Sequence, residues 1–188
     1  TPQWMIEKIR KEHHLDDPLY IRYLFYLKNL LQGDLGYSRS QWMPVIECIK
    51  IFFPATLELT VVALLMSLII GIPLGIVSAT RKDRISDHFS RIFCLSGVSM
   101  ASFWLALLLQ YIFFYVFKTH GLPYFPGGGR HSANIYISQI TGFLMLDSIL
   151  TGNFRGFVDV AWHIIMPAFI VSMRPFASIS RIMGSIML

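Results

Sequence analysis

The feature that most limits what this chain can fold into is a stretch without charged side chains, from Leu59 to Thr80. Its 22 residues would make about 33 Å of α-helix, enough to cross the hydrocarbon core of a bilayer. Two further apolar runs follow, one between Arg91 and Lys118 and one from Asp159 to Arg181 that only Arg174 interrupts. Such runs predict membrane-spanning helices, because helices satisfy all their backbone hydrogen bonds internally.

The composition agrees with a membrane protein. Hydrophobic residues make up 54% of the chain and charged residues 14%, whereas soluble domains carry about 25% charged residues. The net charge of +5 is dispersed, with several basic residues flanking the apolar runs, so we expect no nucleic-acid partner. We predict an all-α, polytopic transmembrane bundle with the lipid bilayer as its partner and spans at about 54–80, 90–117 and 159–183.

The remaining segments divide the chain into two expected parts. Residues 1–53 contain residues typical of helix ends, with Pro18 at a helix start and Gly33 at a helix end. Their apolar residues recur with charged residues between them. They predict an amphipathic helical segment that packs against a partner or the bilayer surface. Residues 54–188 form the transmembrane part, with a connecting loop at 118–158. A patch in this loop, at 135–146, predicts an interfacial or docking helix, with a re-entrant segment as the alternative.

Basic residues orient the spans. Four lysines and arginines crowd residues 81–91, whereas the much longer loop 118–158 carries three. Short basic loops stay in the cytoplasm, so we expect 81–91 to be cytoplasmic and both 1–53 and 118–158 to lie outside. An exported N-terminal segment needs an earlier membrane helix, which we expect upstream of Thr1.

Two motifs in the first span have structural and functional interpretations. Glu58 follows Pro54 by about one turn, so its carboxylate either favours the positive end of the helix dipole or faces a polar translocation pathway. The sequence GIPLG, from Gly71 to Gly75, has a small-xxx-small spacing that favours close helix packing. Pro73 between the two glycines predicts a kink.

No motif predicts an enzyme. The loop RKDRISDHFSR lacks zinc-ligand spacing, and Cys48 and Cys94 give no metal or disulfide pattern. FPGGGR is followed by no phosphate-loop lysine and is most simply a turn. No Ser/His/Asp set, paired carboxylates or Cys/His pair stands at a usable spacing. We therefore expect no cofactor and no metal in this chain.

Arg174 is the unusual residue of the third span. The run contains enough Val, Ile and Phe to contribute roughly 4 kcal/mol to insertion, while one central arginine costs about 3 kcal/mol. Pro175 follows it directly and predicts a bend, because proline removes a backbone donor. Two explanations stay open: Arg174 faces a water-filled pathway or another subunit, or it snorkels toward the inner headgroups near Arg181.

Several blocks in order along the chain resemble the dipeptide and oligopeptide permease family. They are GDLGYS, FPATLEL, GIPLGI, DRISDHFSR, LSGVSMASFWLALLL, GLPYFPGGGR, ITGFLMLDSIL and HIIMPAFI. These permeases are the membrane subunits of bacterial and archaeal ABC importers. The resemblance implies part of a type I permease fold with six helices, of which the first, the last two and the ATPase-coupling loop lie outside this chain.

The resemblance also implies partners and a function. A second permease would complete a heterodimer, two ATP-binding subunits would bind ATP and Mg²⁺, and an extracytoplasmic binding protein would deliver solute. The chain would then be a non-enzymatic transport subunit of the plasma membrane, forming half of an alternating-access pathway. The block ITGFLMLDSILTGN resembles an external insertion of peptide transporters and favours a peptide. Nickel or another small solute is the alternative, and a channel or structural anchor has less support because the sequence shows no filter.

The chain departs from the family pattern at three positions. Ala101 stands where proline is frequent, Gly184 where a basic residue is common, and Arg174 where apolar residues prevail. We therefore regard Arg174 and Glu58 as pathway candidates. If Arg174 lines the pathway, it would meet a peptide carboxylate. Gly71, Pro73, Gly75 and Pro175 are candidates for helix packing or kinks.

Overall fold

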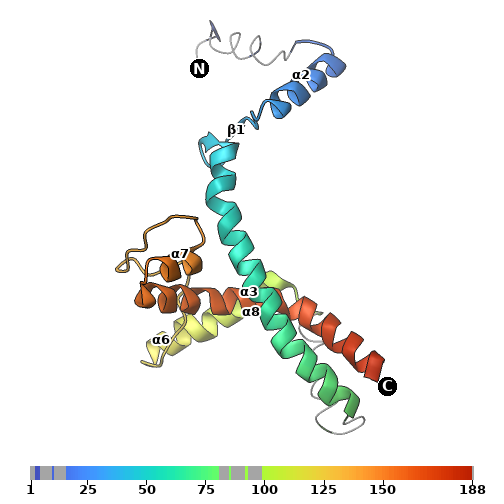
Figure 1. Cartoon of the computed structure of the whole chain (residues 1–188), viewed down its shortest axis with the longest axis vertical. Helices are drawn as coiled ribbons and strands as arrows, with labels where there is room; N and C mark the ends of the chain where they lie inside the picture. Colours follow the sequence, from blue (N-terminus) through green and yellow to red (C-terminus); the bar gives the residue numbers. More distant parts are fainter. Residues whose placement is uncertain are drawn as a thin grey trace. The chain divides into compact units, whose positions relative to one another are not determined.

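The computed structural model describes residues 3–4, 10, 16–80, 85, 92 and 99–187. The described chain is mostly helical (Figure 1) and divides into two units, Thr1–Phe53 and Pro54–Leu188. The basic loop 81–91, Cys94 and the start of the second predicted span fall largely outside the described residues. The all-α class predicted from the sequence is confirmed, with one short hairpin added.

The first unit contains helix α2 (Leu19–Leu31) and a two-stranded hairpin. α2 starts after Pro18 and ends just before Gly33, whose φ of +85° is open to glycine at little cost. Strands β1 (Tyr37–Ser38) and β2 (Met43–Pro44) pair antiparallel. No residue of α2 is buried among the described residues, and most of its side chains are exposed.

Among the residues that the structure describes, three helical stretches are long and apolar enough to cross a membrane, which confirms the three predicted transmembrane helices. They are α3 (Val45–Thr80), the continuous run α5 (Ser102–Gln110), η1 (Tyr111–Val116) and α6 (Phe117–Thr119), and α8 (Phe154–Met187). Their most apolar windows have mean hydropathies of 2.5, 1.4 and 1.6.

The helix bounds differ from the predicted spans. α3 begins nine residues before residue 54, and α8 begins five residues before residue 159 and runs on to Met187. A charge-free run marks only the part of a helix suited to lipid, while backbone hydrogen bonding continues into polar flanks such as Glu47 and Lys50. Both helices also continue through their internal prolines, among them Pro73 and Pro175.

The core of the second unit is the crossing of α3 and α8 (Figure 1). Gly71 and Gly75 lie against the backbone of α8, and Met173, Phe176 and Ala177 form the buried cluster beside them. A Cβ atom on Gly75 would lie 2.7 Å from the carbonyl oxygen of Ser180. The two backbones therefore approach too closely for any side chain at that glycine.

The middle of the loop packs on the first turns of α8. Helix α7 (Leu144–Leu150) lies beside the start of α8 (Figure 1), and Leu144 joins Ile137 and Val160 in a second buried cluster. The predicted helix at 135–146 is wrong over most of its length, because only its last three residues enter α7. Gly142, with φ of +86°, breaks the patch before the helix starts.

Candidate functional site

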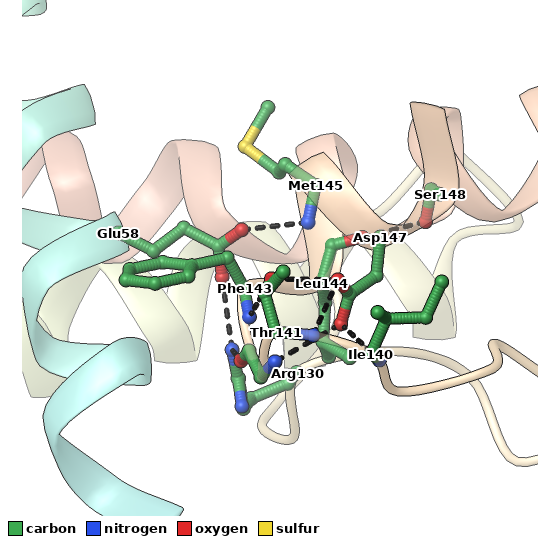
Figure 2. Close-up of polar contacts among 10 residues, drawn as sticks. Glu58, Arg130, Ile140, Thr141, Phe143, Leu144, Met145, Asp147 and Ser148 are labelled. Carbon is green, nitrogen blue, oxygen red and sulfur yellow. Dashed lines mark hydrogen bonds and ion pairs between the residues drawn. The ribbon is translucent and has the colours of Figure 1, made fainter. Parts of the chain in front are cut away.

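Glu58 is a buried carboxylate in the second unit. Its side chain is 7% exposed and accepts two hydrogen bonds, from Arg130 Nη2 at 2.9 Å and from the backbone N–H of Met145 at 2.6 Å (Figure 2). Met145 is the second residue of α7, so its N–H has no partner inside its own helix. Glu58 thus binds both the guanidinium group of Arg130 and the N-terminus of α7.

The expectation that Glu58 interacts with the dipole of its own helix is wrong. α3 begins at Val45, so Glu58 lies in its fourth turn and not near its positive end. The helix whose N-terminus faces the carboxylate is α7. Glu58 therefore joins α3 to the loop, and its place in a solute pathway stays a prediction.

Arg130 is one of the residues of this site that the sequence did not indicate. Its Nη2 atom also donates to the carbonyl oxygen of Gly142, at 3.0 Å, and its side chain is 33% exposed. The arginine stands at the end of FPGGGR, which was interpreted only as a turn. Glu58 and Arg130 are 72 residues apart, and no local spacing connects them.

Asp147 organises the turn before α7. This fully buried carboxylate accepts hydrogen bonds from Thr141 Oγ1 at 2.6 Å and from three successive backbone N–H groups, those of Ile140, Thr141 and Gly142 (Figure 2). Burial raises the pKa of the Asp147 carboxyl, but these hydrogen bonds outweigh it and leave the pKa below its usual value. The ionised carboxylate fixes the turn that presents α7 to Glu58.

We expect acid to weaken this turn through Asp147. Its pKa is lower in the folded state than in the unfolded one, so its contribution is complete above the unfolded pKa and is lost as pH falls through the folded pKa. In Asp147→Asn that acid-dependent loss should disappear, together with part of the stability at neutral pH. Proteolysis of the loop followed from pH 7 to pH 2, on the assembled protein, measures both. An unchanged acid response in the variant would contradict this assignment.

Asp159 and Trp162 tie the loop to α8, and His163 contacts Asp159 within the same helix. The Asp159 carboxylate accepts hydrogen bonds from the Ser132 hydroxyl and from the Ser132 N–H, both at 2.7 Å. His163 Nδ1 lies 2.8 Å from the Asp159 carbonyl oxygen, and the His163 side chain is 6% exposed. Trp162, between them in sequence, stacks on Phe125 with ring centroids 4.3 Å apart. Several independent contacts thus hold the loop against this helix.

A cavity of about 240 Å³ lies beside these groups, between α3, the loop and α8. Glu58, Arg130 and His163 supply its polar wall, and its apolar wall includes Leu59, Val160 and Ile164. A second cavity, of about 190 Å³, has Gln110 in its wall and shares His163 with the first. A few polar groups converging in an apolar pocket are typical of small-molecule sites.

Arg174 lies on the face of α8 that does not pack against α3. It is exposed, as are Val171, Ser178, Arg181 and Ser185 at helical spacing around it. Within the part of the chain that the structure describes, Arg174 has neither a hydrogen bond nor an ion pair. It lies 11 residues beyond His163, or about 16 Å along the helix. The structure therefore does not bring the two pathway candidates together.

Known proteins match nearly the whole chain. A probable D,D-dipeptide transport system permease protein of Escherichia coli is 40% identical over 185 residues, 98% of this chain and 53% of that protein. A dipeptide transport system permease of Alkalihalophilus pseudofirmus is 37% identical over 188 residues, 100% of this chain and 55% of that protein. A di/tripeptide transport system permease of Pseudomonas aeruginosa is 36% identical over 174 residues, 93% and 50% of the two chains.

No protein-family model matches the chain. The chain spans about half the length of the curated relatives it matches. The names of these relatives fit a non-enzymatic transport role, and together with the three apolar helices they make the chain part of a multi-pass membrane protein. The resemblance seen in the sequence blocks is confirmed: the chain belongs to the family of dipeptide transport permeases.

Proposed function

We propose that this chain forms part of the membrane pathway of an ABC importer for dipeptides or oligopeptides. The observation that carries the proposal is its similarity, over nearly its whole length, to permeases named for dipeptide transport. Those names favour a peptide over nickel or another small solute. The chain would supply half of an alternating-access pathway, and its contribution would be a polar route that changes shape.

The partners follow from this class of transporter. A second permease would form a heterodimer with this subunit, two ATP-binding subunits would bind ATP and Mg²⁺ and hydrolyse the nucleotide, and an extracytoplasmic binding protein would deliver the solute. We place the assembly in the plasma membrane of a bacterium or archaeon. Residues 81–91 would then face the cytoplasm, and 1–53 and 118–158 the outside, as the distribution of basic residues predicts.

The exposed face of α8 is our candidate for the pathway wall. Arg174, Ser178, Arg181 and Ser185 follow one another along it at helical spacing. A charged side chain without a partner is costly in hydrocarbon, so such a face is better suited to water, solute or another subunit. The opposite face of the same helix carries the buried residues that pack on α3. The helix thus packs on α3 with one side and exposes two arginines and two serines on the other.

We expect Arg174→Ala to reduce peptide uptake about tenfold while the subunit inserts and assembles normally, because a pathway carboxylate contact to arginine is charge-assisted. Uptake of a labelled dipeptide into cells measures this. Arg155→Ala is the matched control, since it removes an exposed arginine from the first turn of the same helix. Normal uptake by Arg174→Ala would instead support snorkelling of the side chain toward headgroups.

A further inference from the structure

The cavity of about 190 Å³ between the second span, the loop and α8 has an uncharged wall. Among the described residues, this wall contains no lysine, arginine, aspartate or glutamate, and His163 is its one titratable group. Neither Glu58 nor Arg130 lines it. Burial of a charge without a partner is costly, whereas a neutral polar group needs only hydrogen bonds. The wall is therefore suited to an uncharged part of a solute.

Gln110 supplies an amide group to this wall. Its Nε2 atom donates a hydrogen bond to the carbonyl oxygen of Gly127, at 2.5 Å, which identifies the nitrogen because a carbonyl oxygen only accepts. Oε1 of Gln110 has no hydrogen-bond partner among the described residues. Every fully buried side-chain nitrogen or oxygen of those residues has a partner, so Oε1 is accessible. It is an acceptor that a solute can reach.

The backbone adds further uncharged polar groups to the wall. Gly128 and Gly129 are exposed and line the cavity, and within the described residues neither makes a hydrogen bond through its N–H or its carbonyl oxygen. Pro167 has no N–H to donate to the carbonyl oxygen of His163, one turn earlier in α8. A group that enters the cavity thus meets backbone donors as well as acceptors.

The cavity lies on the same side of α8 as Arg174. Pro167 and Ile170 line it, and Arg174 follows them by seven and four residues, which is about two turns and one turn of the helix. The axial distance from Pro167 to Arg174 is about 10 Å. An extended peptide covers about 3.3–3.6 Å per residue, so a solute of two or three residues can extend from this cavity toward the arginine.

We propose that this cavity binds a peptide bond of the transported solute. Gln110 Oε1 accepts the N–H of that bond, and the backbone N–H of Gly128 or Gly129 donates to its carbonyl oxygen. Every peptide carries this group whatever its side chains, so the contact suits peptides of different sequence. The proposal rests on the proposed function and adds to it the part of the solute that this subunit recognises.

The test uses the assembled transporter in nanodiscs without its solute-binding protein, so that binding by the permeases is measured alone. The ligands are alanyl-alanine and alanyl-lactate, an ester in which an oxygen replaces the peptide N–H while both charged ends remain. The ester leaves Gln110 Oε1 without a donor and should bind about tenfold more weakly. Equal affinity for the two ligands would overturn the proposal, and this comparison needs no variant.

Two glutamine variants locate the contact. Gln110→Met removes the acceptor, and it also removes the hydrogen bond to Gly127, which affects both ligands alike. The readout is therefore the ratio of the two affinities, which should fall below about threefold. Gln139→Met, at an exposed glutamine of the same loop, is the control and should keep the wild-type ratio. A wild-type ratio in a properly assembled Gln110→Met transporter would contradict the proposal.

ATP-driven uptake by the complete wild-type system separates the two proposals. Peptide uptake by a transporter whose permeases bind the amide and the ester equally would leave the proposed function standing and sink this site. Absence of peptide uptake by the wild-type transporter would sink the proposed function itself.

Discussion

Gly75→Val should separate α3 from α8 and destabilise the second unit by about 3 kcal/mol. A Cβ atom at Gly75 would lie 2.7 Å from both the Ser180 carbonyl oxygen and Met183 Cβ. One of these is backbone and the other lies at the base of its side chain, so neither can rotate away. We expect the assembled, detergent-solubilised transporter to lose its monodisperse elution peak at a temperature roughly 6–12 °C lower.

Gly184 provides the matched control. It lies across the same helix crossing, but a Cβ atom there would meet its nearest neighbour, the Gly75 carbonyl oxygen, at 3.9 Å, an ordinary contact. Gly184→Ala should therefore change stability by less than about 0.5 kcal/mol. Equal effects of the two substitutions would mean that α3 and α8 do not pack through Gly75.

The membrane-spanning elements could be predicted because their signal is local. A stretch of about twenty residues without charge can be seen directly in the sequence. Such stretches predicted α3, the second span and α8. The same signal could not give the helix ends, because hydrogen bonding continues into polar residues such as those after Val45. Nor did it foresee the π-helical stretch Tyr111–Val116, whose composition is no less apolar than its surroundings.

The site was less predictable because its contacts are distant in sequence. Glu58 stood out as a carboxylate at the edge of an apolar run, but its partners Arg130 and Met145 lie 72 and 87 residues away. Asp147 directly follows a patch, 135–146, whose hydropathy favoured a longer helix, whereas its carboxylate holds the backbone in a turn before α7. His163 drew no attention, since a single histidine in an apolar helix has no spacing to interpret.

Glu58→Gln should weaken the attachment of the loop to α3 and lower the free energy of unfolding by about 3 kcal/mol. This is the lower end of the range for breaking a buried ion pair, and we expect the lower end because Arg130 is one third exposed. The glutamine oxygen can still accept from the Met145 N–H, so the substitution removes chiefly the charge facing Arg130. Faster proteolysis within 118–158 and a lower unfolding temperature measure the effect. Glu47→Gln, an exposed glutamate in the first turn of the same helix, is the control and should have no effect.

A double-mutant cycle with Arg130→Met tests whether the two residues act as a pair. Each single substitution leaves the other polar group without its partner, whereas the double variant leaves no unpaired charge. The loss of stability in the double variant should therefore be smaller than the sum of the two single losses by at least about 1 kcal/mol. Additivity within about 0.5 kcal/mol would mean that Glu58 acts on α7 through Met145 alone. The hydrogen bond from Arg130 to the Gly142 carbonyl oxygen would then be the contact that positions the arginine.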